Sequence, residues 1–512
     1  MKKPTVILFT LTDQSNSHTF GLFSIKAYAL EYLKYRPQPS IIIKIFKTKD
    51  SEYNQDSLFF KLTEKEIDHI VHWLLQKKPL IIGFSCWLNN SKVMLTIADK
   101  IKKRNKKIKL VIGGPETYHN YFYDMKKIMK KEKAIDVIAR YDGEEVFLEL
   151  LESFLYQKRT LAEIKGITYR DGKKICLTPE RGPTDLNKIP SPYSKGLIMI
   201  NKTIKKAVME LSRGCPYRCN YCSYPLGIYR YYRCFPMKQI QNDLKYLLKK
   251  DIKSITMVDS NFNVYENRIT EILKIIQQNN KKNMGVGVFY NASKKIINKE
   301  IIDLFFSSKI KLTIGVQAIN PHTLQLANRQ GDMSILEKNL YLLDKKDVTY
   351  ALEFIYGLPG DSYIDIKNVI NWLFQFNARS VHFYRLSVQR NTPFFFQAKQ
   401  LGLIYKKTPP YHVIQTKTFS KEDINKIGKM LKLVRYYYDL QLLRKMIYQI
   451  NVVFHLNYAD IFEKIIIWDR SFGSKPLSPI YAYKRTQQFF AYLLRSTYVN
   501  HAGISPMSAR RG

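Results

Sequence analysis

The sequence of 512 residues is poor in cysteine and has no long hydrophobic run. Six cysteines are too few for a disulfide framework in a chain of this length. No uninterrupted apolar stretch is long enough to span a bilayer. The opening MKKPTVILFT is followed by polar residues rather than by a small-residue cleavage pattern, so we expect a first strand there and not a signal peptide. These absences favour a cytoplasmic protein without a membrane span.

Acidic residues are also scarce, because 83 Lys and Arg stand against 43 Asp and Glu and give a formal net charge of +40. Such an excess can attract nucleic acid or an anionic membrane surface. The basic runs 100–109 and 126–133 fall on predicted exposed helix faces and turns, and no RNA-binding motif accompanies them. We favour a compositional bias spread over solvated faces, and we expect a monomer without a nucleic-acid partner.

The first part of the chain alternates apolar, β-rich runs with helical patterns. This alternation predicts an open, mostly parallel, doubly wound sheet of Rossmann-like type, whose ligands bind beyond the carboxyl ends of the strands. The expected strands are 5–11, 41–46, 80–85, 108–112 and 135–139, and the expected helices are 22–35, 64–77, 91–104 and 144–156. A β-hairpin at 166–178 and a proline-containing linker at 185–193 follow.

A second alternating series begins near residue 205. Six strand–helix units predict a partial (β/α)6 barrel of TIM-like type, with its chemistry at the carboxyl ends of the strands. The expected strands are 207–211, 253–258, 286–290, 311–317, 349–356 and 380–387, and the expected helices are 237–250, 265–280, 298–307, 334–345 and 363–377. Helices at 421–450, 455–468 and 479–496 then predict a helical C-terminal domain. The expected domains are 1–190, 191–405 and 406–512.

Half of the cysteines fall in RGCPYRCNYCSYP, residues 213–225, directly after the first barrel strand. Their spacing, C-x3-C-x2-C, brings the thiols of Cys215, Cys219 and Cys222 close enough to hold a metal or an iron–sulfur cluster. Structural zinc sites use four ligands, commonly in two C-x2-C pairs, and no second pair is present. A cubane iron–sulfur cluster on three cysteines leaves one iron open for another ligand. Tyr221 adds an aromatic wall.

This stretch resembles the signature of the radical S-adenosylmethionine (SAM) enzymes, in which three cysteines hold a [4Fe–4S] cluster and the open iron binds SAM. Four later stretches resemble other segments of the same family in order: TMVDSNFNV, GVQAIN, IYGLPGD and RLSVQRNTPF. In the last of these, Asn391 replaces a glycine. The resemblance implies that Tyr224, Asp259, Gln317 and Glu353 contact SAM or substrate. Each of the last three could instead be a satisfied polar residue of the barrel interior.

The N-terminal part is similar to the cobalamin-binding domain that precedes the barrel in one subgroup of the family. The loops GFSCWLNN, VIGGPET and DGEEVF carry this similarity. From these loops we expect the following residues to contact the corrin: Ser85, Cys86, Trp87, Asn89, Gly113, Gly114, Pro115 and Glu144. His18 lies where some cobalamin proteins have a cobalt ligand, but Asn16 replaces the usual aspartate, so a loop residue beside the corrin is the alternative.

Similarity to this subgroup implies a cobalamin-dependent methyltransferase with a [4Fe–4S] cluster, SAM and cobalamin as cofactors. A 5′-deoxyadenosyl radical would activate an unactivated carbon, and methylcobalamin would supply the methyl group. We expect a peptide or small natural-product substrate and a low-potential electron donor of flavodoxin or ferredoxin type. The alternatives are a non-methylating enzyme that forms or rearranges a ring, a cofactor-binding redox sensor without enzymatic activity, against which the GLPG and GVQ segments argue, and, less favoured, a tRNA-modifying enzyme. The latter family has a second three-cysteine cluster, whereas only Cys86 and Cys176 lie upstream here.

Overall fold

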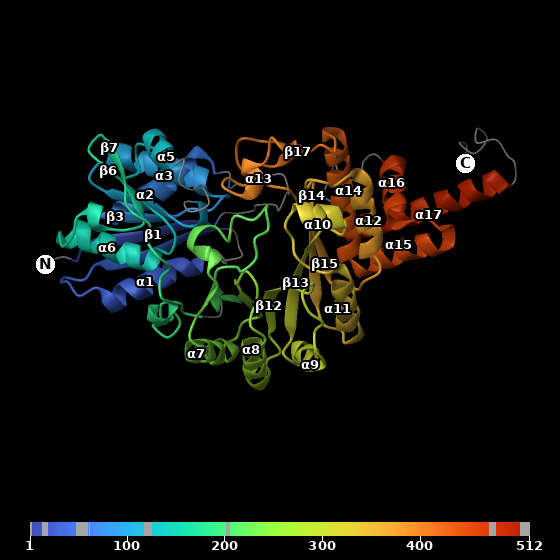
Figure 1. Ribbon diagram of the computed structural model, residues 1–512, viewed down its shortest axis with the longest axis horizontal. Helices are drawn as coiled ribbons and strands as arrows, with labels where there is room; N and C mark the ends of the chain where they lie inside the picture. Colours follow the sequence, from blue (N-terminus) through green and yellow to red (C-terminus); the bar gives the residue numbers. More distant parts are fainter. Residues whose placement is uncertain are drawn as a thin grey trace.

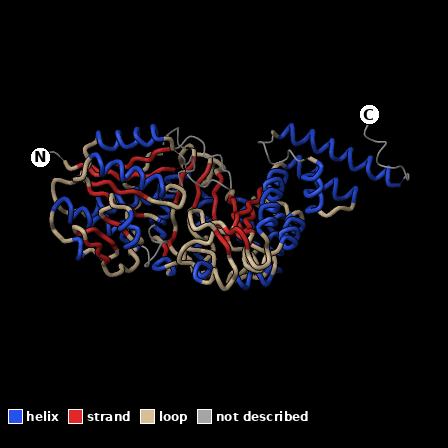
Figure 2. Tube along the Cα trace, turned by 90° about the horizontal axis from the view of Figure 1, so that it is seen from above, coloured by secondary structure: helices blue, strands red, loops and turns tan. Residues whose placement is uncertain are grey.

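The computed structural model describes residues 3–12, 19–47, 60, 62–116, 125–200, 205–469 and 478–501, with side chains to residue 496. Two sheets with their helices lie next to each other, and a helical region follows at the end of the elongated molecule (Figure 1). Seen from above, the last helices project away from the body (Figure 2). The described residues contain no helix that is long and apolar enough to cross a membrane.

The N-terminal sheet has seven strands in the order β2-β1-β3-β4-β5-β6-β7. Strands β1 to β5 are parallel, as the sequence predicts, and the β6–β7 hairpin extends the same sheet in antiparallel fashion. Every β1 residue after Thr5 is buried, because helices cover both faces of a doubly wound sheet. The strands are β1 (Thr5–Thr12), β2 (Ser40–Lys47), β3 (Ile81–Ser85), β4 (Lys109–Gly113), β5 (Val137–Ala139), β6 (Ile167–Asp171) and β7 (Lys174–Leu177).

The helices of this region begin and end close to the predicted positions. Thr63 starts α2 with a capping box, in which its side chain and that of Glu66 exchange hydrogen bonds with the backbone. The basic run 126–133 is largely the exposed face of a short helix whose Met125 and Met129 are buried. The helices are α1 (Phe20–Tyr32), α2 (Glu64–Gln76), α3 (Ser91–Arg104), α5 (Met125–Lys131) and α6 (Gly143–Tyr156).

The second sheet has six parallel strands in the order β15-β14-β13-β12-β11-β8. Its first and last strands do not pair with each other among the described residues, so the barrel is open, as predicted. The strands are β8 (Lys206–Met209), β11 (Ser254–Met257), β12 (Gly285–Tyr290), β13 (Ile310–Gln317), β14 (Tyr350–Tyr356) and β15 (Ser380–Arg385). The main helices between and after them are α7 (Met237–Leu248), α8 (Glu266–Asn279), α9 (Lys299–Ser307), α11 (Met333–Lys345) and α12 (Tyr363–Leu373).

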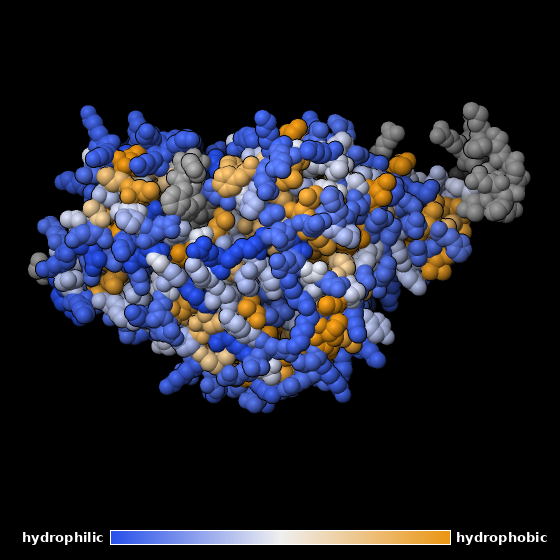
Figure 3. Space-filling model, in the orientation of Figure 1, coloured by the Kyte–Doolittle hydropathy of each residue, from blue (hydrophilic) through white to orange (hydrophobic). Residues whose placement is uncertain are grey.

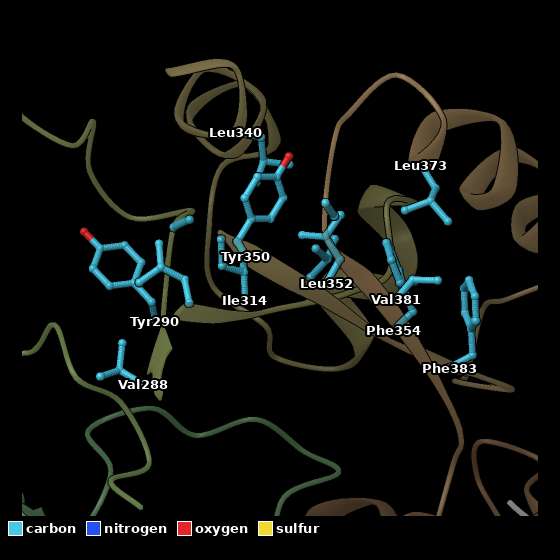
Figure 4. Close-up of a cluster of buried hydrophobic side chains, with 14 of the residues drawn as sticks. Val288, Tyr290, Ile314, Leu340, Tyr350, Leu352, Phe354, Leu373, Val381 and Phe383 are labelled. Atoms are coloured by element: carbon cyan, nitrogen blue, oxygen red, sulfur yellow. The ribbon is translucent and has the colours of Figure 1, made fainter. Parts of the chain in front are cut away.

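Alternate strand residues of the barrel pack outward against these helices. In Figure 4, Tyr350, Leu352 and Phe354 of β14 lie between neighbouring strands and the side chains of Leu340 and Leu373 from α11 and α12. Residues at the other positions of β14 are only partly buried, because they face the barrel interior.

The C-terminal helices correct one prediction. A single helix over 421–450 is wrong, because Leu440 is extended (φ −96°, ψ 103°) and separates α14 (Lys421–Asp439) from α15 (Gln441–Phe454). The Asp439 carboxylate accepts a hydrogen bond from the Val381 N–H at 2.9 Å, which ties the end of α14 to the barrel edge. Helices α16 (Tyr458–Trp468) and α17 (Pro479–His501) follow.

Candidate functional site

A cavity of about 250 Å³ lies between the N-terminal sheet and the start of the barrel. It opens at the carboxyl ends of β3, β4 and β5, beside the point where the strand order reverses between β1 and β3, which is where doubly wound sheets bind their ligands. Phe20, Gly21 and Leu22 of α1 line one side, and Phe147 and Leu150 of α6 line another. Most of the wall is therefore apolar, as in sites for large organic ligands.

The loops after β3 and β4 are held against each other by their main chains. The Cys86 N–H donates to the Gly113 carbonyl at 2.7 Å, and the Glu116 N–H donates to the Cys86 carbonyl at 3.1 Å. Gly114 has φ +97°, and a Cβ there would stand 2.7 Å from the Cys86 carbonyl oxygen. This position therefore needs glycine for its backbone conformation and its close packing.

Most of the predicted corrin contacts lie in the cavity wall, but not all. Cys86 and Asn89 are not among the lining residues: the Cys86 side chain is buried in the core of the N-terminal sheet, and the Asn89 carbonyl accepts from the Phe60 N–H. Those that line the cavity are Ser85, Trp87, Gly113, Gly114, Pro115 and Glu144. His18 lies outside the described residues.

Asn90, which the sequence analysis passed over, organises this end of the sheet. Its side-chain oxygen accepts from the Trp87 N–H at 2.7 Å, and its amide donates to the Leu11 carbonyl at 3.1 Å and the Ser85 carbonyl at 3.2 Å. The residue is fully buried. It joins the ends of β1 and β3 and so fixes the shape of the cavity mouth.

A buried ionic network connects the two sheets beside the cavity. Arg213, directly before the cysteine loop, contacts Asp142 at 3.2 Å, Glu144 at 2.7 Å and Glu210 at 2.9 Å. Arg233 reaches Asp142 at 2.9 Å. Burial opposes the charge of Asp142, but the two arginines outweigh it and hold the pKa of that carboxyl below its usual range.

Glu210 differs from its neighbours in this network. Burial raises the pKa of its carboxyl, and the Arg213 guanidinium only partly offsets that effect. Glu144 lines the cavity as predicted, but its carboxylate is bonded to Arg213. Its role in the structure is therefore to join the domains as well as to face the cavity.

The cysteine loop follows β9 (Ser212–Arg213), and its conformation depends on glycine and on anchors from the barrel. Gly214 has φ +97°, and a Cβ there would lie 2.1 Å from the Tyr231 carbonyl oxygen. The Ser260 hydroxyl donates to the Gly214 carbonyl at 2.6 Å. The Asn220 N–H donates to the Ala327 carbonyl at 2.9 Å, and the Asn220 carbonyl accepts from the Phe394 N–H at 3.1 Å.

The three cysteines lie on this anchored loop as free thiols. Cys219 is buried, while Cys215 and Cys222 are partly buried, and burial raises the pKa of the Cys222 thiol to about 12. Among the described residues, no three Cys, His, Asp or Glu side chains are arranged as ligands of one metal ion. In a cubane each cysteine binds a different iron, so the three thiols of such a site need not converge on one point.

Arg329 is a second functional candidate that motif reading missed. Its guanidinium lies 3.9 Å from the Cys219 sulfur and donates to the Gly315 carbonyl at 2.6 Å. Burial works against its charge, but Tyr221 and Cys219 nearby raise its pKa further. A cation held here would stabilise a cysteine thiolate and attract an anionic group such as a carboxylate.

The predicted barrel residues have unequal freedom to bind a ligand. The Asp259 carboxylate accepts from the Leu211 N–H at 3.2 Å and from the Ser212 hydroxyl, so it anchors the start of the cysteine loop. Burial raises its pKa to about 7. Gln317 ends β13 with φ +76° and is partly exposed. Glu353 faces the barrel interior and accepts from the Tyr384 hydroxyl at 3.3 Å.

Of the two predicted tyrosines, Tyr224 lines the cavity and Tyr221 does not. The Tyr224 hydroxyl accepts from the Gly214 N–H at 3.3 Å, and its ring packs against that of Tyr229 with the centroids 5.5 Å apart and the planes inclined by 38°. Tyr224 and Tyr229 both line the cavity. Tyr221 packs against the barrel core, and burial raises its pKa. One wall of the cavity is thus the outer side of the loop that carries the cysteines.

Comparison with known families agrees with the radical SAM resemblance that the sequence motifs of the barrel carry. Residues 209–373 match the model of the radical SAM superfamily. The barrel is a radical SAM domain. Residues 399–501 match a second model, described as a protein of unknown function, DUF4080.

Individual relatives extend the similarity beyond the barrel. The cobalamin-dependent radical SAM methyltransferase TokK of Streptomyces tokunonensis is 22% identical over 335 residues, which are 62% of this chain and 48% of TokK. The anaerobic magnesium-protoporphyrin IX monomethyl ester cyclase of Rubrivivax gelatinosus is 24% identical over 352 residues, which are 66% of this chain and 59% of the cyclase. The chain spans about half the length of the first curated relatives that it matches.

A solved structure shares the architecture of almost the whole chain. The cobalamin-dependent SAM radical enzyme OxsB aligns with a TM-score of 0.65 over 98% of this chain and 81% of its own, at 16% identity. Another OxsB structure contains bound aqua-cobalamin and SAM. At this identity the likeness shows a common fold: a Rossmann-like sheet, a partial barrel and a helical C-terminal region.

Proposed function

We propose that this chain is a cobalamin-dependent radical SAM methyltransferase that acts on an unactivated carbon of a peptide or small natural product. One observation carries the proposal. The cavity at the ligand-binding end of the N-terminal sheet and the loop with three cysteines share the wall formed by Arg213, Tyr224 and Tyr229. Two cofactors placed in these sites would lie next to each other, as a reaction that uses both requires.

The residues fit the groups that the proposal requires. The cavity combines an apolar wall with open space beside Gly21, where a Cβ would meet no atom within 4 Å. Ser85, Trp87 and the glycines after β4 would hold cobalamin there, and Cys215, Cys219 and Cys222 would hold a [4Fe–4S] cluster. When bound, the cluster and SAM supply hydrogen-atom abstraction and cobalamin supplies a transferable methyl group.

The chain's own side chains position these groups and keep water away. Arg329 offers a cation next to Cys219, where it would pair with the SAM carboxylate. Gln317 and Glu353 would bind the remaining polar groups of SAM or substrate from β13 and β14. Radical SAM enzymes need an external electron donor, and we infer a low-potential flavodoxin or ferredoxin.

The test is anaerobic reconstitution with iron, sulfide and cobalamin, followed by assays of SAM cleavage and of bound cobalamin. We expect SAM cleavage in the native chain and its loss in Cys219→Ala, with cobalamin still bound in the variant. Cys176→Ala, in the β7 hairpin, is the matched control and should cleave SAM normally. Full SAM cleavage by Cys219→Ala would overturn the cluster assignment.

Ring formation without methyl transfer is the second candidate, because a cyclase is among the relatives. The mass of the product separates the two candidates. Methyl transfer adds the mass of one CH2 unit to the substrate, whereas oxidative ring closure removes two hydrogens. Neighbouring genes would narrow the choice of substrates to be assayed.

A further inference from the structure

The outer surface of helices α15, α16 and α17 is unusually apolar. We define it by its exposed apolar side chains: Leu442, Tyr448, Val452, Val453, Ile467, Ile480, Tyr481, Tyr492 and Leu494. These are nine of the 23 large exposed hydrophobic residues of the described chain, yet they come from only three helices. Figure 3 shows hydrophobic surface over α15 and α17, where these helices project from the body. Such a concentration is typical of a binding surface.

The acidic side chains of this region form ion pairs or hydrogen bonds with other parts of the fold. Asp460 and Glu463 of α16 pair with Lys367 of the barrel helix α12 at 2.7 and 2.8 Å. Asp439 is bonded to the barrel edge, and Asp469 is paired with Arg485. The acidic side chains from Asp439 onward are thus occupied by neighbours within the fold and leave the outer surface to other residues.

Cations accompany the apolar side chains on this outer surface. Lys445, Lys464, Lys484 and Arg495 are exposed, and none of them forms an ion pair with a described residue. On α17, Arg485 is paired with Asp469, whereas Lys484 and Arg495 have no ion-pair partner among the described residues. The surface is therefore apolar and positive, without a compensating negative charge.

On α15 and α17 the sequence spacing places both kinds of side chain on one face. On α15, Leu442, Lys445, Gln449 and Val452 recur every three or four residues. On α17, Tyr481, Lys484, Gln488, Tyr492 and Arg495 follow the same period. The exposed faces of α15 and α17 thus carry aliphatic or tyrosine side chains together with cations, and such cations are attracted to the phosphates of an anionic lipid surface.

We propose that the outer surface of α15, α16 and α17 binds the surface of an anionic phospholipid membrane. A second copy of this chain fits the surface poorly, because a symmetric contact would bring cations against cations. Nucleic acid would match the charge but not the exposed aliphatic side chains, since its interfaces are mainly polar. A lipid surface satisfies both, with phosphates for the cations and acyl chains for Leu442, Val452 and Ile480. The helices would lie on the membrane and not cross it.

Co-sedimentation of the full chain with vesicles tests this proposal. We expect binding to phosphatidylcholine vesicles that contain phosphatidylglycerol, weakening as salt is added, and little binding to phosphatidylcholine alone. The double variant Lys445→Gln/Lys484→Gln should bind about thirtyfold more weakly, because each cation near an anionic surface contributes about 1 kcal/mol. Val452→Glu/Val453→Glu should also lose binding.

The controls separate a specific surface from general basicity. Tyr341→Glu changes an apolar residue on the barrel helix α11 that is more exposed than Val452 and Val453, and Lys103→Gln removes a cation from the N-terminal region. Both should bind vesicles like the native chain, and all variants should retain the native circular dichroism spectrum. The proposal is overturned if the chain binds both vesicle types equally, if it binds neither, or if the control variants lose as much vesicle binding as the test variants. A dimer that the Val452→Glu/Val453→Glu variant abolishes would also overturn it.

Discussion

The cavity of the N-terminal sheet and the cysteine loop of the barrel lie side by side, but different interactions determine their shapes. The N-terminal sheet provides a cavity whose mouth is shaped by main-chain bonds and glycines after β3 and β4. The barrel provides a loop whose position depends on buried side chains, chiefly Asp259 and Ser260, bonded to its backbone. Main-chain geometry thus shapes the cavity, whereas buried side chains hold the cysteine loop in place.

Arg213 lines the cavity and directly precedes the cysteine loop, so its removal should have the largest effect on stability. Arg213→Met would leave the buried Glu144 and the partly buried Glu210 without their cation and should lower the free energy of unfolding by about 3–5 kcal/mol. The exposed pair of Lys103 and Asp99 on α3 is the control, and Lys103→Met should cost about 0.5 kcal/mol. Urea titration measures both. Equal effects of the two variants would show that the network does not join the sheets.

Alanine substitutions at two glycines with positive φ compare the cysteine loop with an ordinary turn. Gly214→Ala adds a Cβ 2.1 Å from the Tyr231 carbonyl oxygen, whereas Gly172→Ala, in the β6–β7 turn, meets no atom within 4 Å. We expect Gly214→Ala to cost about 3 kcal/mol and to reduce the iron bound after reconstitution. Gly172→Ala should cost about 1 kcal/mol, because only the left-handed backbone is strained, and should keep its iron.

The architecture and the cysteine loop could be predicted from the sequence because their signals are local. Alternating apolar periods mark β1 to β5 and the six barrel strands, and the spacing of Cys215, Cys219 and Cys222 lies within one short loop. The break at Leu440 could not be predicted, because it depends on a bond from Asp439 to the distant strand β15. Helical periodicity continues across it.

Long-range pairing also explains the residues that were missed. Glu144 was predicted, but its pairing with Arg213 was not, because the two lie 69 positions apart and Arg213 has no distinctive pattern of its own. At the β3 loop the prediction chose Asn89, while Asn90 makes the bonds to the ends of β1 and β3. Which of two adjacent asparagines turns inward depends on the exact end of the strand, and a motif does not specify this.

A pH experiment sharpens the role of Asp259 as an anchor of the barrel loop. Burial raises the pKa of its carboxyl from 3.8 to about 7, against the opposing bonds from Ser212 and Leu211. Its contribution to stability is therefore present in full below pH 4 and lost as the pH rises toward 7, because the unfolded chain ionises first. Asp259→Asn should reduce the fall in stability between pH 5 and pH 8 by about 2 kcal/mol. An unchanged pH dependence in urea titrations would contradict the buried position of this carboxyl.

The smallest expected effect concerns the wall that the two sites share. Tyr224→Phe keeps the ring against Tyr229 but removes the hydroxyl that accepts from the Gly214 N–H, at a cost of about 1 kcal/mol. Cobalamin should still bind, because the cavity needs only the ring, whereas iron incorporation should fall because the loop loses an anchor. Tyr32→Phe removes a hydroxyl that donates to the Lys188 carbonyl away from the loop and should change neither readout. If Tyr224→Phe lost cobalamin but kept its iron, the hydroxyl would be shaping the cavity and not anchoring the cysteine loop, and the role assigned to it here would be wrong.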